Sequence, residues 1–424
     1  MEPQPPNLVQ WCFTRYLIVM AESHHLRLSA PLTAARDRGP SRYFHGRIRS
    51  QRKFKELLHR ATQAGNGTTF LIQGPPGVGK TALVYECKRH ALEGGWDVAS
   101  VNPPTLWDPN EMLYALGRGS RLRLTGGSGK VGVDAVVKIE AGLDFSVNQE
   151  TRTVLQVLRG GKKPLLLALD EAQALGKPNI PPPDQVGVVN SVLNNIHNGD
   201  LDRPVILLAA GLGTTLKSFG KLGISRFAAH CVVELGALSK EDERAVIRDW
   251  IKKEGRAKGD PTGWIDAITR ETHRWPQHIQ IYADIAAEQL KADGGIMTPE
   301  GLRAVLEAGR EDRKVYYKQR VDDFRVDQLR SLARTIAAVP QGEPAEYRDI
   351  VSSLARDYGD DGAETLFKSL EEEGLLARSG MGYAVPIPLM HAWLKDEYVR
   401  EKIEFPRDPQ KGQSTHEQSS GLEH

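Results

Sequence analysis

The sequence predicts a three-layer α/β domain with a parallel sheet, then a helical lid domain, then a small C-terminal winged helix-turn-helix. Three observations support this fold class. Short apolar runs alternate with helical patterns over residues 41–237, which is typical of a parallel sheet covered by helices. The pattern is wholly helical over 238–323. Residues 324–398 combine three helical patterns with one hairpin pattern.

Within the α/β domain, the expected strands are short apolar runs. They are 68–72, 97–101, 165–169, 205–209 and 231–235. Those at 165–169, 205–209 and 231–235 are expected to be central parallel strands buried on both faces. Helical patterns connect them at 54–61, 81–92, 111–116 and 151–158. Residues 117–142 are rich in Gly, Ser and Lys, and we expect them to be an insertion that contains a hairpin.

The lid is expected to begin with a helix capped by Ser239, because Asp242 follows three residues later as in a capping box. Further helices are expected at 264–270, 276–291, 299–318, 327–338, 346–358 and 364–373. The hairpin is expected at 375–385 around a Ser-Gly-Met-Gly turn. A generic small helical domain is the alternative for this C-terminal part.

Bulk properties set limits on function. A chain of 424 residues is too long for one compact core, so two or three domains are expected. The net charge of +2 gives no overall attraction to nucleic acid, so any such binding would need a local patch. Cys12, Cys87 and Cys231 have no paired spacing, which fits a reducing cytoplasm.

The ends of the chain are expected to lie outside the domains. Residues 1–40 are predicted to form an arm and 399–424 a disordered tail. The apolar stretch 8–20 is interrupted by Gln10 and Arg15 and makes a poor signal peptide. No run is long enough to cross a bilayer, so no membrane partner is expected.

One segment fits the phosphate-binding pattern G-x-x-x-x-G-K-[ST] at every fixed position. Its residues lie between an expected strand and an expected helix: Gly74, Pro75, Pro76, Gly77, Val78, Gly79, Lys80 and Thr81. Glycines let backbone N–H groups turn inward, and the helix N-terminus adds its positive end. Lys80 would reach the β- and γ-phosphates, and the Thr81 hydroxyl would bind Mg²⁺. A chance Gly/Pro turn is the alternative.

A second motif follows the apolar strand 165–169. Asp170 at its end is placed to hold Mg²⁺, and Glu171 is suited to orient and deprotonate the water that attacks the γ-phosphate. An acidic helix cap is the alternative reading. Together the two motifs predict a site that binds a nucleoside triphosphate with Mg²⁺, and the two acids favour its hydrolysis.

Residues 43–394 resemble the AAA+ ATPases of the bacterial and archaeal type related to origin-recognition and STAND ATPases, including their C-terminal winged helix. The resemblance rests on Gly46-Arg47, the two motifs above as Walker A and Walker B, and the helical lid. It also rests on Gly211-Leu212-Gly213-Thr214-Thr215, Gly223-Ile224-Ser225-Arg226-Phe227 and the closing segment 386–394. It implies that Arg47 lies near the adenine.

The resemblance further implies that Arg226 is a finger that reaches the γ-phosphate of a neighbouring subunit, so that the active species is a homo-oligomer. A surface arginine before the fifth strand is the alternative. Two positions depart from the family. Ala209-Ala210-Gly211 replaces a polar sensor, which leaves Thr214 as the nearest substitute. Arg274 stands where the lid of relatives carries Gly, and either acts as a second sensor or is a solvated helix-start arginine.

The winged helix has an acidic candidate reading helix. It carries Glu364 and the run Glu371, Glu372 and Glu373, with Lys368 its only basic residue, which phosphates would repel. DNA contact would then fall to the wing at Arg378, the stretch 310–320, the amino-terminal arm, or the insertion with Arg121, Arg123, Lys130 and Lys138. Docking of a partner protein on the winged helix is the equal alternative.

Two functions therefore compete. The first is an ATPase that assembles on DNA in replication, transposition, or a mobile-element or defence process. The second is a STAND-like signalling switch that oligomerises to recruit an effector protein. The weak sensor positions favour slow or partner-stimulated hydrolysis in either case. A DEAx-type helicase is disfavoured because no second nucleotide-type α/β domain follows.

Overall fold

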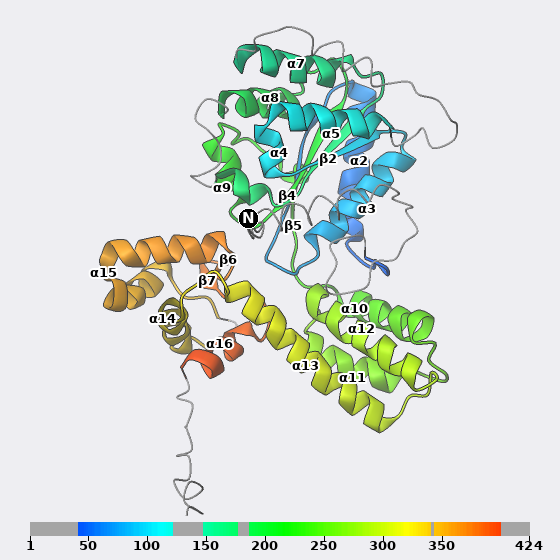
Figure 1. Cartoon of the computed structure of the whole chain (residues 1–424), viewed down its shortest axis with the longest axis vertical. Coiled ribbons are helices and arrows are strands. Elements are labelled where there is room, and N and C mark those ends of the chain that lie inside the picture. The colour runs from blue at the N-terminus through cyan, green and yellow to red at the C-terminus, as the bar shows by residue number, and fades with distance from the viewer. Residues whose placement is uncertain (1–40, 122–146, 177–185, 341–342, 400–424) are drawn as a thin grey trace, which may run out of the picture.

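The computed structural model describes residues 41–121, 147–176, 186–340 and 343–399 (Figure 1). The expected arm, the expected tail and most of the expected insertion lie outside these residues. The described chain forms an α/β part, a helical part and a small C-terminal part. Among the described helices, none has the length and apolar character needed to cross a membrane.

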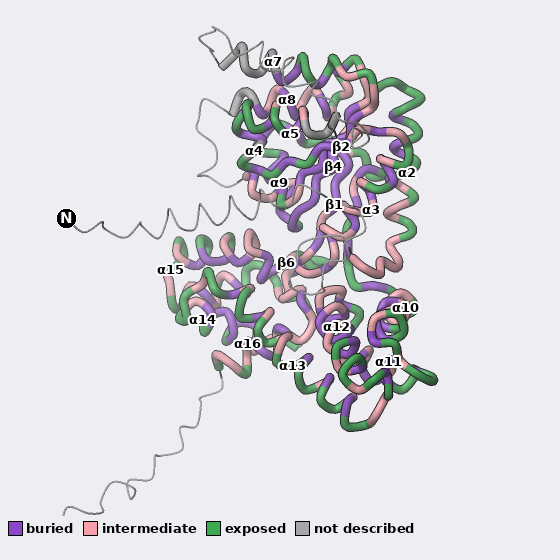
Figure 2. The backbone as a smooth tube through the Cα atoms, turned by 45° about the vertical axis from the view of Figure 1, so that its right-hand side comes forward, coloured by how far each residue is buried: buried purple, intermediate pink, exposed green. Residues whose placement is uncertain are grey.

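A five-stranded sheet in the order β2-β3-β4-β1-β5 forms the centre of the α/β part. Every pairing in it is parallel. Its strands are β1 (Thr68–Gln73), β2 (Asp97–Val101), β3 (Leu165–Leu169), β4 (Val205–Gly211) and β5 (Val232–Glu234). Both β3 and β4 are buried along their whole length, and Figure 2 shows the same for the centre of the sheet. The predicted parallel sheet is confirmed.

Helices cover the sheet on both sides, because alternate residues of each strand point to opposite faces. On one face, Phe70, Ile72 and Leu208 pack with α2 (Ile48–Ala64) and α3 (Lys80–Glu93). On the other, Leu71, Leu167 and Leu207 pack with a second set of helices. That set is α4 (Pro103–Trp107), α5 (Pro109–Arg121), α7 (Val147–Gly160), α8 (Val186–Asn198) and α9 (Thr215–Lys221). The three layers are as predicted, although α4, α8 and α9 were not anticipated.

The helical part begins where Ser239 caps its first helix by accepting a hydrogen bond from the Asp242 amide at 3.0 Å, as the capping-box pattern predicts. Its elements are α10 (Lys240–Asp249), a π-helical turn (Trp250–Glu254), α11 (Thr262–Thr272), α12 (Pro276–Ala292) and α13 (Pro299–Val321). They enclose a core of their own around Trp250, Ile268 and Tyr282. Helix α13 continues from this lid to the C-terminal part (Figure 1).

The C-terminal part has three helices followed by a hairpin, the order expected of a winged helix-turn-helix, and one more helix after the hairpin. Its elements are α14 (Val326–Ala337), α15 (Tyr347–Glu372), β6 (Ala377–Ser379), β7 (Gly382–Ala384) and α16 (Met390–Tyr398). Helix α15 is two helices joined at Gly359, whose φ of 67° and ψ of 173° are not helical. That glycine accounts for the boundary predicted between 358 and 364. A bridge between Ala345 and Tyr383 adds a third extended segment.

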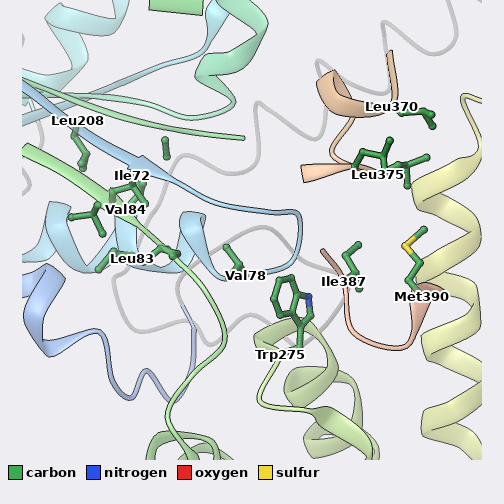
Figure 3. Packing of buried hydrophobic residues seen from close by; sticks show 14 of the residues in the cluster. Ile72, Val78, Leu83, Val84, Leu208, Trp275, Leu370, Leu375, Ile387 and Met390 are labelled. Atoms are coloured by element: carbon green, nitrogen blue, oxygen red, sulfur yellow. The ribbon is translucent and has the colours of Figure 1, made fainter. Parts of the chain in front are cut away.

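The three parts share one apolar cluster. Figure 3 shows Val78 of the phosphate loop beside Trp275 of the lid and Ile387 of the C-terminal part. All three are buried. The parts therefore meet next to the phosphate loop, which is where any bound ligand would contact all of them.

Candidate nucleotide-binding site

A cavity of about 630 Å³ lies at this junction. Part of its lining is apolar and comes from the segment before α2 and from the lid: Phe44, Leu238, Val246, Ile279 and Ile281. Another part consists of the loop residues 76–81 with Glu171, Gln173 and Arg320. A slot for an aromatic base beside a cradle for phosphates is the arrangement that a nucleotide requires.

The phosphate loop has the conformation that its sequence predicts. Gly77 has φ of 73° and Gly79 has φ of 90°, a left-handed backbone that glycine adopts without strain. Helix α3 begins at Lys80, so its N-terminus faces the loop. Free backbone N–H groups at a helix start, together with the helix dipole, favour an anion there.

Lys80 lies at the centre of the loop. Its Nζ donates to the Gly74 carbonyl at 2.9 Å and to the Pro75 carbonyl at 3.0 Å. Burial lowers the pKa of Lys80 to about 8, while the charges of Glu171 and Asp170 act in the opposite direction. An ammonium has three donors, so this group can also serve a phosphate oxygen, whose charge would compensate for burial.

Thr81 and Asp170 bring the two motifs together. The Thr81 hydroxyl donates to Asp170 Oδ2 at 2.9 Å, across the carboxyl end of β3. A hydroxyl and a carboxylate are ligands that Mg²⁺ prefers, and Mg²⁺ commonly keeps one or two protein ligands beside phosphate and water. The Thr81 and Asp170 oxygens fit a metal shared with phosphate. Among the described residues there is no cluster of three or more His, Cys, Asp or Glu that could hold a metal.

Glu171 is held in an unusual backbone conformation. Its φ is 55°, a left-handed value that is uncommon for a residue other than glycine and is often found at functional sites. Its amide donates to Asp170 Oδ1 at 3.0 Å, and its Oε2 accepts from Gln173 Nε2 at 2.6 Å. Gln173 Oε1 in turn accepts from the Leu212 amide at 3.1 Å. The glutamate is thus tied to the end of β4.

Gln173 was missed in the sequence, although a signal was present. The strand end at Ala209 and Ala210 has no polar side chain. A polar side chain from another segment is therefore needed to link this strand end to Glu171. Gln173, two residues after Glu171, supplies it through the backbone of Leu212.

Arg47 lies at the boundary between the α/β part and the lid. Its Nη2 donates to the carbonyls of Val78 at 3.0 Å and Gly236 at 2.5 Å. The segment before it is fastened to the lid, since Tyr43 Oη donates to Glu254 at 2.7 Å. Arg47 also lines the cavity, close to the apolar slot.

The remaining predicted site residues are elsewhere. Over the described chain, the cavity lining includes neither Thr214 nor Arg274 nor Arg226. Thr214 is buried at the start of α9. Arg274 is exposed, and its amide donates to Glu243 Oε1 at 2.8 Å. Arg226 is exposed in the loop before β5, where its carbonyl accepts from His197 Nε2 at 2.8 Å.

Known structures share this architecture. The ORC2 protein of Aeropyrum pernix in its ADP form aligns over 85% of this chain and 95% of that chain, with a TM-score of 0.55 and 14% identity. Its ADPNP–ADP complex aligns over 84% and 94%, with a TM-score of 0.51 and 17% identity. A Walker-type ATPase of Pyrococcus abyssi aligns over 87% and 99%, with a TM-score of 0.50 and 14% identity. No protein-family model and no curated protein matches the sequence.

The chain shares its fold with these two proteins.

In this fold the lid contacts the phosphate loop directly. The Gln277 amide at the start of α12 donates to the Gly77 carbonyl at 3.1 Å. Helix α13 adds Tyr316 and Arg320 to the cavity, and the end of α15 adds Glu373. The sequence indicates Arg320 only as part of the basic stretch 310–320, which could contact DNA. Its place in the cavity follows from how α13 packs, which no local pattern indicates.

Proposed function

We propose that this chain binds ATP with Mg²⁺ and hydrolyses it to ADP and phosphate, at sites formed between copies of the chain. The observation that carries the proposal is the 2.9 Å hydrogen bond between Thr81 and Asp170. It joins the phosphate loop to the acidic strand end, and Thr81 and Glu171 both line the cavity. The fold shared with the Aeropyrum pernix protein in its ADPNP–ADP complex supports the same conclusion.

Each part of the site is proposed to bind a different part of ATP or to take part in its hydrolysis. The loop amides and Lys80 hold the phosphates, while Arg47 and the apolar slot hold the base. Thr81 and Asp170 hold Mg²⁺, which neutralises charge on the phosphate oxygens when it is bound. Glu171, oriented by Gln173, accepts the proton of the attacking water.

Arg226 is proposed to complete the site of a neighbouring copy. A guanidinium can neutralise the charge that develops on the transferred phosphoryl group. Arg226 is exposed and is outside its own chain's cavity lining, as a residue acting on another chain would be. The following Phe227 packs on His197 and Phe219, with ring centroids at 5.0 Å and 5.6 Å, which holds the segment in place.

Arg226→Ala should lower ATP turnover about 100-fold with little change in ATP affinity, because it removes one charge-stabilising donor. Mixing it with Lys80→Ala subunits should restore turnover, since those subunits still supply Arg226 to an intact site. Phosphate release from single variants and from mixtures is the measurement. Arg303→Ala, which removes an exposed arginine paired with Glu300 in the lid, should have no effect. Failure of the mixture to recover would contradict a finger acting between chains.

DNA is the proposed partner of the oligomer, in replication, transposition, or a mobile-element or defence process. The stretch 310–320 no longer supports this, because Arg310 and Arg313 both pair with Glu271 and Arg320 lines the cavity. The wing remains available. Arg378 is exposed there, and Met381 at its tip is 97% exposed.

A signalling switch is the second candidate, and one contact favours it. Lys217 of α9 pairs with Glu371 of α15 at 2.8 Å, so the acidic helix end is docked on the α/β part rather than presented to a groove. In such a switch, nucleotide exchange would release the C-terminal part to recruit an effector protein.

Sizing the protein with ADP and with a non-hydrolysable ATP analogue, with and without duplex DNA, separates the two candidates. An ATPase that acts on DNA should bind the duplex, show DNA-stimulated turnover, and lose both steeply as salt rises. A switch should assemble with the analogue alone and leave its turnover unchanged by DNA. Binding that is insensitive to salt would contradict contact with the phosphate backbone.

A further inference from the structure

Arg320 is a cation in the nucleotide cavity that neither sequence motif includes. It lies near the C-terminal end of α13, the helix that links the lid to the C-terminal part. Its side chain lines the same cavity as Lys80 and residues 76–79. Its charge acts on Lys80, since it contributes to the lowering of the Lys80 pKa. Two cations therefore face the region where phosphates would lie.

The donors of Arg320 are incompletely used. Its Nη2 donates to the Glu373 carbonyl at 2.8 Å, at the end of α15. Its Nε is buried and has no hydrogen-bond partner within the described part of the chain. A buried N–H without a partner is destabilising, so an acceptor brought to this guanidinium would be favoured. A guanidinium presents its donors as a fork that matches a phosphate.

The surroundings place Arg320 beside the phosphate loop. A Cβ built on Gly77 would lie 2.5 Å from Tyr316 Oη and 3.1 Å from Trp275 Nε1, so α13 and the lid lie directly over the loop. Acidic groups are also present in the cavity wall, namely Asp312, Glu171 and Glu373. A phosphate would enter a site of mixed charge, in which Arg320 lines the cavity together with Lys80 and Arg47.

We infer that Arg320 binds the γ-phosphate of ATP and transmits its presence to the C-terminal part through Glu373. The inference rests on the proposed function, because it needs ATP in this cavity. ADP has no γ-phosphate, so Arg320 then keeps only its contact with the Glu373 carbonyl. The next residue, Gly374, lies against Pro76 and Leu212, where an added Cβ would be 2.9 Å and 3.4 Å from their side chains. The docking of the C-terminal part is thereby connected to the phosphate site.

The test is the affinity of Arg320→Ala for a non-hydrolysable ATP analogue and for ADP, measured by calorimetry on the full chain. We expect the affinity for the analogue to fall about tenfold and that for ADP to change by less than about twofold, since one charge-assisted hydrogen-bonding group is lost only at the third phosphate. Arg310→Ala is the matched control, because Arg310 is on the same helix and pairs with Glu271 at the surface. It should bind both nucleotides as the wild type does.

Equal losses for both nucleotides would overturn the inference and leave Arg320 a structural residue. Unchanged affinity for the analogue would also overturn it. If Arg320→Ala does not fold, Arg320→Met keeps the aliphatic stem while removing the donors, and the same two results apply. A wild-type chain that binds neither nucleotide would instead contradict the proposed function.

Hydrogen exchange at residues 371–376 tests the coupling separately from binding. In the wild type, the analogue should change amide protection in this segment and ADP should not. In Arg320→Ala at saturating analogue, the change should be absent. A response that persists in the variant would contradict transmission through Arg320.

Discussion

Lys80→Ala should lower ATP affinity at least about 100-fold and reduce turnover below detection. The ammonium is buried at the centre of the phosphate loop, where it would contact two phosphates, and each hydrogen bond to a charged group contributes about 1.5–3 kcal/mol. The variant should remain folded, because burial disfavours the charged lysine in the free protein. Calorimetric titration with ATP, beside a thermal unfolding curve, measures both effects.

Arg89→Ala is the matched control for this prediction. It removes an exposed cation from the same helix; Arg89 pairs with Glu86 and Glu93 and does not belong to the described lining of the cavity. Its ATP affinity should equal that of the wild type. ATP affinity retained by a folded Lys80→Ala would contradict the assignment of the site.

Glu171→Gln should bind ATP as tightly as the wild type and hydrolyse it about 1000-fold more slowly, the order expected for loss of a general base. The substitution conserves size, and an amide oxygen can still accept from Gln173 Nε2. Only the capacity to take a proton is removed. Phosphate release and equilibrium ATP binding, measured on the same preparation, test the prediction.

Glu288→Gln is the control for Glu171→Gln, since Glu288 is an exposed carboxylate of the lid that pairs with Lys291 and is outside the described lining of the cavity. It should turn over ATP at close to the wild-type rate. Wild-type turnover in Glu171→Gln would show that a residue other than Glu171 is the general base.

The parts of the site that could be predicted are local in the sequence. The phosphate loop is eight consecutive residues between a strand and a helix, and Asp170 and Glu171 directly follow the buried strand β3. Parallel strands have their carboxyl ends at one edge of a sheet, so these motifs had to meet. The 2.9 Å contact between Thr81 and Asp170 is the result.

The parts that could not be predicted depend on how distant elements pack. Gln173 reaches the end of β4 because a short 3₁₀ turn (Ala172–Gly176) follows Glu171. Arg320 reaches the cavity because α13 crosses from the lid to the C-terminal part. Neither consequence is visible in the spacing of residues along the chain.

Two residues suggested by family resemblance, Arg274 and Thr214, lie outside the described lining of the cavity. The Arg274 backbone has φ of 62°, and its amide and carbonyl are engaged by Glu243 and Leu238. Its side chain is exposed. Thr214 is buried where α9 begins. Their roles as sensors remain predictions, and in this structure Arg320 and Gln173 line the cavity instead.

The central claim is that this cavity hydrolyses ATP with Mg²⁺, and phosphate release by the wild-type chain tests it most directly. We expect the chain to bind ATP and to release phosphate in the presence of Mg²⁺. Phosphate release should stop when Mg²⁺ is chelated or when Lys80 is replaced. Duplex DNA should be present in one arm to reveal stimulated turnover. A chain that binds ATP and releases no phosphate with Mg²⁺ in either arm would contradict the claim.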